Sequence, residues 1–181
     1  MTQPQRKPMT SAEFLAWEAK QELKWEFDGV QPIAMTGGSF AHSRIQGRLI
    51  TALNNRLTGK PCQPCGPDMR VPTGSGRYRY PDALVTCASV PPDALDVLEP
   101  VVLFEVLSPS TEREDRKVKL REYCSIPSVR RYVMLEQDEI AATVFARTET
   151  GWSLDLLDMG DTLVMPEISV EIPLAELYAN V

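Results

Sequence analysis

Two acidic residues, Asp82 and Glu105, interrupt segments that otherwise have the composition of buried strands. Asp82 lies near the start of the segment 81–87, and Glu105 lies within the segment 101–107. Apolar and β-branched residues run through both segments without polar alternation, which is typical of strands covered on both faces. Desolvation of an unpaired carboxylate costs several kcal/mol, so Glu105 must be paired, protonated or bound to a cation.

A charged segment after the second strand offers a partner for these acids. The capping-box sequence Thr-Glu-Arg-Glu at 111–114 predicts a helix that continues to Tyr123. Asp115, Lys119 and Tyr123 recur every four residues and would therefore share one helix face. A solvated Asp–Lys pair on the helix surface is the alternative explanation of this spacing. Two acids at strand ends with a lysine on the following helix instead predict a divalent-cation site that also holds a cation for phosphoryl charge.

The elements that must position these residues can be predicted along the whole chain. Residues 10–21 read as a first helix, and 24–27 with 30–35 read as a β-hairpin around a two-residue Asp28-Gly29 turn. Ser39 would cap a second helix, whose apolar stripe is Ile45, Leu49, Leu53 and Leu57. Later segments predict strands at 131–136, 140–147, 152–157 and 168–172, and a short helix at 173–178. Strands around a few helices, without regular βαβ alternation, predict an α/β (α+β) fold with a mixed central sheet flanked by helices.

The combined pattern resembles the Uma2 family, within the PD-(D/E)xK restriction-endonuclease-like superfamily, over nearly all of the chain. The resemblance rests on Trp-Glu-Phe-Asp-Gly at 25–29, His42, Tyr-Pro-Asp at 80–82, Glu-Val-Leu-Ser-Pro-Ser-Thr at 105–111, Asp115, Lys119, Tyr123, and the strand at 131–136. It implies a nuclease-like core in which Asp82 and Glu105 bind the metal. Leu107 stands at the third position of the Glu-x-Lys triplet, so the resemblance assigns the role of the missing lysine to Lys119.

The function expected from this resemblance is metal-dependent endonucleolytic hydrolysis of phosphodiester bonds in DNA. Asp82, Glu105 and the carbonyl of Val106 would hold Mg²⁺ or Mn²⁺, which activates a water and neutralises phosphate charge. Lys119 would stabilise the phosphorane or orient the water. The alternative is a catalytically silent, homodimeric interaction module that keeps the nuclease fold.

Four further residues are auxiliary candidates: Glu26, His42, Asp115 and Tyr123. Asp115 would orient Lys119 through a contact four residues apart on the helix, and the Tyr123 hydroxyl would do so from the other side. His42 could serve a second metal or proton transfer, or could be an inward-facing histidine with no chemical role. Glu26 could join the site, as the family pattern suggests, or could be an exposed hairpin residue.

The net charge of the chain and the distribution of its basic residues limit the classes of function that remain. The chain has 181 residues and a net charge of −6, which argues against a protein that simply coats nucleic acid. Residues 41–80 nevertheless carry seven basic side chains and one acidic side chain. A basic face that meets phosphates could be built from Arg44, Arg48, Arg56, Arg70, Arg77, Arg79, Arg116 and Arg121, and a solvated surface of mixed charge is the alternative.

Length, hydropathy and cysteine content predict a single cytoplasmic domain over 1–181, with flexible residues 1–9 and no membrane contact. The expected partners are nucleic acid and, if the chain forms a homodimer, a second copy of the chain. The four cysteines do not indicate a disulfide scaffold in a chain of this length. Cys62-Gln63-Pro64-Cys65 has the spacing of a metal-binding pair, so a small zinc site that recruits Cys87, Cys124 or His42 is a further alternative.

Overall fold

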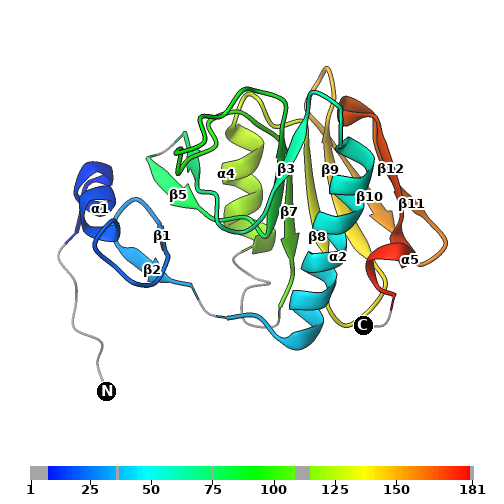
Figure 1. Cartoon of the computed structure of the whole chain (residues 1–181), viewed down its shortest axis with the longest axis horizontal. Coiled ribbons are helices and arrows are strands. Elements are labelled where there is room, and N and C mark those ends of the chain that lie inside the picture. The colour runs from blue at the N-terminus through cyan, green and yellow to red at the C-terminus, as the bar shows by residue number, and fades with distance from the viewer. Residues whose placement is uncertain (1–7, 36, 75, 109–114, 180–181) are drawn as a thin grey trace.

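The computed structural model describes residues 8–35, 37–74, 76–108 and 115–179 (Figure 1). Its helical elements are α1 (Ser11–Glu18), α2 (Phe40–Leu57), a π-helical turn η1 (Asp115–Lys119), α4 (Leu120–Ser125), a 3-10 turn η2 (Pro166–Ile168) and α5 (Leu174–Leu177). Its strands are β1 (Trp25–Phe27), β2 (Pro32–Ala34), β3 (Gln63–Cys65), β4 (Val71–Thr73), β5 (Arg77–Arg79), β6 (Ala83–Thr86), β7 (Pro100–Val106), β8 (Arg131–Leu135), β9 (Ala142–Arg147), β10 (Trp152–Leu157), β11 (Thr162–Met165) and β12 (Val170–Pro173).

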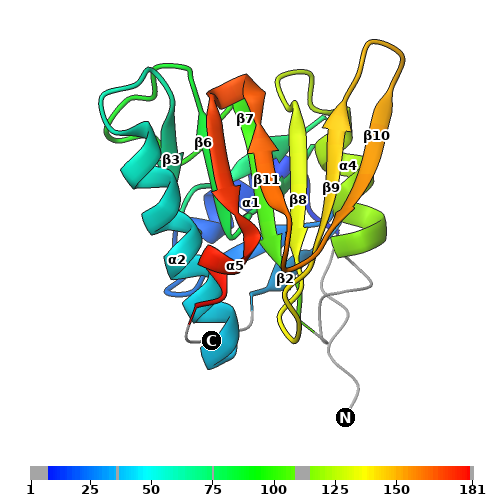
Figure 2. The ribbon, with the colours of Figure 1, turned by 90° about the vertical axis from the view of Figure 1, so that its right-hand side faces the viewer.

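A six-stranded sheet in the order β10-β9-β8-β7-β6-β3 forms the centre of the fold. Strands β7 and β8 are parallel, and the other neighbours are antiparallel. Helix α2 and the β11–β12 hairpin lie against one face, while α4 lies against the other (Figures 1 and 2). The predicted stripe of α2 is buried in the first of these interfaces, from Ile45 to Leu57. The predicted fold class, a mixed central sheet flanked by helices, is confirmed.

A second sheet, in the order β2-β1-β5-β4, holds the N-terminal hairpin. The predicted turn in this hairpin is displaced by one residue. Phe27 pairs with Pro32, and the Asp28 N–H donates to the Gln31 carbonyl at 3.3 Å, so the two residues at the tip are Gly29 and Val30 and not Asp28 and Gly29. The Asp28 carboxylate accepts hydrogen bonds from the backbone N–H groups of Val30 and Gln31, at 2.8 and 2.7 Å, and this local Asx-type contact favours the displaced turn.

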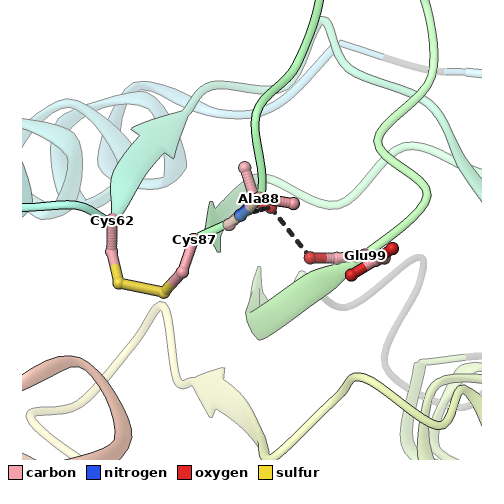
Figure 3. The surroundings of a disulfide bond; sticks show 5 residues. Cys62, Cys87, Ala88 and Glu99 are labelled. Carbon is pink, nitrogen blue, oxygen red and sulfur yellow. Dashed lines mark hydrogen bonds between the residues drawn. A yellow bond between two sulfur atoms is a disulfide. The ribbon is translucent and has the colours of Figure 1, made fainter.

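The cysteines were not expected to form a disulfide scaffold, but Cys62 and Cys87 form a disulfide (Figure 3). Gln63 pairs with Thr86, so the two cysteines extend the β3–β6 ladder by one residue and lie opposite each other. Both sulfur atoms are therefore consumed, which removes the zinc site based on Cys62 and Cys65. Cys65 and Cys124 remain as free thiols. The sequence spacing suggested that Cys62 and Cys65 act as a pair, whereas the pairing of β3 with β6 places Cys62 opposite Cys87.

Two predictions concern residues outside the described ranges. The capping box at 111–114 lies outside them, as do residues 1–7 of the segment expected to be flexible. The helix expected to continue to Tyr123 is present from Asp115 and ends at Ser125. Among the described residues, no helix combines the length and the hydropathy needed to cross a membrane.

Candidate functional site

Glu105 lies on β7 in the buried environment predicted from its sequence, with 4% of its surface exposed. Its Oε1 atom accepts two hydrogen bonds, from Lys119 Nζ at 3.0 Å and from the Tyr123 hydroxyl at 2.9 Å. Burial, followed by the negative charges of Glu105 and Glu26, raises the pKa of Tyr123 well above its ordinary value. The phenol thus remains a donor, and Glu105 is paired as its burial requires.

Lys119 bridges two acids rather than decorating a solvated helix. Its side chain is 9% exposed, and Nζ lies 3.1 Å from Glu26 Oε1 as well as 3.0 Å from Glu105 Oε1. The reading of Lys119 as half of a surface pair is therefore wrong. The reading of Glu26 as an exposed hairpin residue is also wrong, because Glu26 is 7% exposed. Burial favours a higher pKa for Glu26, but Lys119 and Arg79 together outweigh burial, and the pKa is lowered.

Asp82 stands immediately before β6 and is oriented by three donors. Its Oδ2 atom accepts the Val106 backbone N–H at 2.7 Å and lies 3.2 Å from His42 Nε2, and its Oδ1 atom accepts Gln46 Nε2 at 3.1 Å. His42 and Gln46 are one turn apart on α2, so they reach the same carboxylate. The inward orientation predicted for His42 is confirmed, with 15% of its side chain exposed.

The two predicted metal-binding carboxylates belong to neighbouring strands. Ala83 pairs with Phe104 in the antiparallel β6–β7 ladder, so the next position of the same register sets Asp82 opposite Glu105. The bond from Val106 N–H to Asp82 anchors the carboxylate beside the residue that follows Glu105. Thus Asp82, Glu105 and the backbone of Val106 lie at one end of this strand pair, with Lys119 bound to Glu105.

A buried arginine extends the site in a way that sequence reasoning missed. Arg79 on β5 is 1% exposed and donates to Glu26 Oε2 at 2.9 Å and to both carboxylate oxygens of Glu122, at 2.7 and 3.0 Å. A chain of alternating charges therefore runs from Glu122 through Arg79, Glu26 and Lys119 to Glu105. Gln46 could have been found as the residue four positions after His42. No sequence pattern indicated that Glu122 is buried, because an acidic residue on a charged helix is ordinarily solvated.

The basic face was predicted incorrectly for half of its arginines, which are paired with carboxylates: Arg56 with Glu176, Arg70 with Glu18 and Asp96, and Arg77 and Arg79 with Glu122. Arg70 and Arg79 are buried as well. Arg121 is exposed on α4, and Arg44 and Arg48 are half-buried on α2. Charge counts along the chain overestimated the basic surface, since they take no account of pairing across elements.

The π-helical turn η1 ends at Lys119 and leads directly into α4. π-Helical turns are rare in proteins overall, but those that do occur lie frequently at functional sites. They also break the α-helical spacing of four residues, on which the predicted stack of Asp115, Lys119 and Tyr123 depended. The side chain of Asp115 lies outside the described part of the chain, so its predicted role stays a prediction.

The donor chemistry of the site fits a hard divalent cation. Mg²⁺ takes oxygen ligands and is commonly held by one or two carboxylates, with water completing its shell. Asp82, Glu105 and the Val106 carbonyl supply oxygen donors of this kind. Among the described residues, no group of three or more His, Cys, Asp or Glu side chains is arranged as a metal cluster.

Comparisons with known proteins agree with this architecture. The sequence model of the Uma2 family, described as "Putative restriction endonuclease", matches residues 11–175. Uncharacterized protein slr1290 of Synechocystis sp. is 31% identical over 175 residues, covering 94% of this chain and 91% of its own length. Uncharacterized protein sll1609 of the same organism is 29% identical over 135 residues, covering 72% and 76%.

A solved structure shares the fold. It is described as a putative nuclease belonging to DUF820 from Anabaena variabilis, and it superimposes with a TM-score of 0.79 at 18% identity. The match covers 95% of this chain and 98% of the other.

Proposed function

We propose that this chain, which belongs to the Uma2 family, is a metal-dependent endonuclease that hydrolyses phosphodiester bonds of DNA. The observation that carries the proposal is the juxtaposition of Asp82 and Glu105 on neighbouring strands, with Lys119 bound directly to Glu105. Two oxygen-donor carboxylates and one amine are the groups that phosphoryl chemistry needs at a restriction-endonuclease-like site.

Each residue contributes a distinct task. Asp82 and Glu105, with the Val106 carbonyl, would hold Mg²⁺ or Mn²⁺. When bound, the metal supplies Lewis-acid chemistry that lowers the pKa of a coordinated water and neutralises phosphate charge. Lys119 keeps a positive charge beside Glu105, where it can orient the water or stabilise the phosphorane.

Several neighbours position these groups. Gln46 and the Val106 N–H fix the Asp82 carboxylate, and Tyr123 fixes the Glu105 carboxylate. Glu26 binds the other side of the Lys119 ammonium and thereby limits its freedom. His42 lies within reach of Asp82 Oδ2, where it would serve proton transfer or a second metal.

The nuclease proposal is tested with purified protein, single- and double-stranded DNA, and Mg²⁺ or Mn²⁺ at low salt. Wild type should cut, and chelation should abolish cutting. Asp82→Asn should remove activity, and Lys119→Met should lower the rate constant by about 10²–10³-fold, the usual effect of losing one transition-state donor. Added salt should weaken substrate binding as phosphate contacts are screened.

Lys117→Met is the matched control, because Lys117 is exposed on the same segment as the buried Lys119. It should leave the chemical step unchanged. If folded Asp82→Asn cuts as well as wild type, the activity belongs to a contaminant or to another site. If wild type neither binds nor cuts DNA under these conditions, the nuclease proposal fails.

A non-catalytic interaction module is the second candidate, and one observation favours it. Glu105 and Asp82 already receive two and three contacts, respectively, from protein donors, so their burial is accounted for without a metal. Thermal unfolding separates the two functions. A metal site predicts that Mg²⁺ or Mn²⁺ raises the Tm of wild type and not of Glu105→Gln, whereas an interaction module predicts no shift in either.

A further inference from the structure

The two edges of the central sheet differ in how they are protected. Strand β3 forms one edge, is three residues long, contains Pro64, and adjoins the Cys62–Cys87 disulfide (Figure 3). Short length and proline are devices that prevent an edge from pairing with another chain. Strand β10 forms the other edge, is six residues long and contains neither proline nor lysine (Figure 2). Among the described residues, no strand pairs with its outer side.

The outward-pointing backbone groups of β10 can be assigned from its hairpin with β9. The Thr148 N–H donates to the Gly151 carbonyl at 2.8 Å, whereas the Arg147 N–H turns away to Arg130. Hydrogen-bonded and non-bonded pairs alternate in an antiparallel ladder, so Arg147 and Trp152 form a non-bonded pair. The N–H and C=O groups of Trp152, and by alternation of Leu154 and Leu156, therefore point to the outer edge.

The same three residues present an apolar row on one face of the sheet. Leu154 is 54% exposed and Leu156 is 73% exposed, and Trp152 is half-buried beside Arg147. Leu154 pairs with Phe145 on β9, which extends the row inward. An exposed apolar row along an unpaired edge is characteristic of a surface that binds another strand.

We propose that β10 pairs antiparallel with β10 of a second copy of this chain, about a two-fold axis through Leu154, so that two six-stranded sheets become one continuous sheet. In this register Leu154 faces Leu154 of the second copy, and Trp152 faces its Leu156. All of the outward backbone groups assigned above then find partners. The contact is isologous and closes after two copies, because the opposite edge of each sheet is the protected strand β3.

Strand length and charge select this register over its two neighbours. Pairing about Leu154 sets the uncharged Ser153 opposite Asp155 of the second copy, and it keeps Trp152, Leu154 and Leu156 opposite residues of β10. Pairing about Asp155 would set two exposed carboxylates directly opposite each other, which is destabilising, and would set Trp152 opposite Asp158, whose N–H already donates to Asp161. Pairing about Ser153 would set Leu156 opposite Thr150, which lies outside β10, so the axis falls on Leu154. This inference is independent of the proposed nuclease activity.

The oligomeric state of the full chain tests the proposal. Light scattering coupled to size-exclusion chromatography, over a series of concentrations, should give a dimer mass for wild type. Leu154→Lys places two ammonium groups against each other at the axis and should shift the mass to that of a monomer. Leu98→Lys is the matched control, since Leu98 is 71% exposed on the loop before β7, and it should remain dimeric. Thermal unfolding confirms that both variants are folded.

Cysteine cross-linking tests the register. Directly opposite, hydrogen-bonded residues have Cα atoms about 5.5 Å apart, which a disulfide can span. Under mild oxidation Leu154→Cys should form a covalent dimer above the wild-type background set by Cys65 and Cys124, and Asp155→Cys should not. A monomeric wild type, or a Leu154→Lys variant that dimerises like wild type, would overturn the interface. Preferential cross-linking of Asp155→Cys would overturn the register.

Discussion

Replacement of Arg79 by methionine isolates the energetic role of the buried charge network. The Arg79 guanidinium is 1% exposed and donates hydrogen bonds to both carboxylate oxygens of Glu122 and to Glu26. Methionine fills a similar volume without charge, so the substitution leaves two buried carboxylates without this partner. Removal of one side of a buried ion pair costs about 3–5 kcal/mol, because the remaining charge stays desolvated.

Arg77→Met is the control that makes the comparison sharp. Arg77 lies on the same strand and donates to the same Glu122 Oε1 atom at 2.7 Å, but its side chain is 37% exposed. An ion pair at this exposure contributes about 0–1 kcal/mol. The two variants remove the same type of residue from one strand and differ mainly in burial.

The assay is urea unfolding together with thermal unfolding. In a chain of this size, 1 kcal/mol corresponds to about 2–4 °C in Tm, so Arg79→Met should lower Tm by about 6–20 °C. Addition of Glu122→Gln to Arg79→Met should restore part of the loss, because a neutral amide replaces one of the unpaired carboxylates. Equal decreases in Tm for Arg79→Met and Arg77→Met would refute the view that the desolvated carboxylates of the buried network destabilise the fold when Arg79 is removed.

Two further stability measurements follow from the structure. Because the pKa of Glu26 is lowered in the folded protein, its carboxylate stabilises the fold above its ordinary pKa of 4.5 and loses this contribution as pH falls through the lowered value. The difference in unfolding free energy between wild type and Glu26→Gln should therefore shrink below about pH 4.5. A difference that does not change with pH would contradict this assignment. The Cys62–Cys87 bond closes a loop with a sequence separation of 25, so Cys62→Ser/Cys87→Ser should cost about 2–4 kcal/mol. Dithiothreitol should lower the Tm of wild type to that of this double variant and leave the variant itself unchanged, and an unchanged wild-type Tm would contradict the disulfide.

Local sequence patterns determined the elements that carry the candidate site. Continuous apolar residues around Glu105 predicted a strand covered on both faces, and the structure has β7 buried there. The capping serine and the 3.6-residue stripe predicted α2, whose helix begins after Ser39 and ends at Leu57. These features depend on residues close together in the chain, so the periodicity of burial is sufficient to reveal them.

Only the tertiary structure decided which charges and thiols meet. Arg79 reads as one more basic residue in the sequence, yet its partners Glu26 and Glu122 lie 53 and 43 residues away. Cys62 has Cys65 close by in sequence, yet it bonds to Cys87 because β3 and β6 pair in that register. Burial and strand register select such partners, and both depend on how distant segments pack. The sequence by itself therefore determined that Glu105 would lie on a buried strand and that α2 would present an apolar stripe, and packing determined which charged groups lie together and which arginines no longer face solvent.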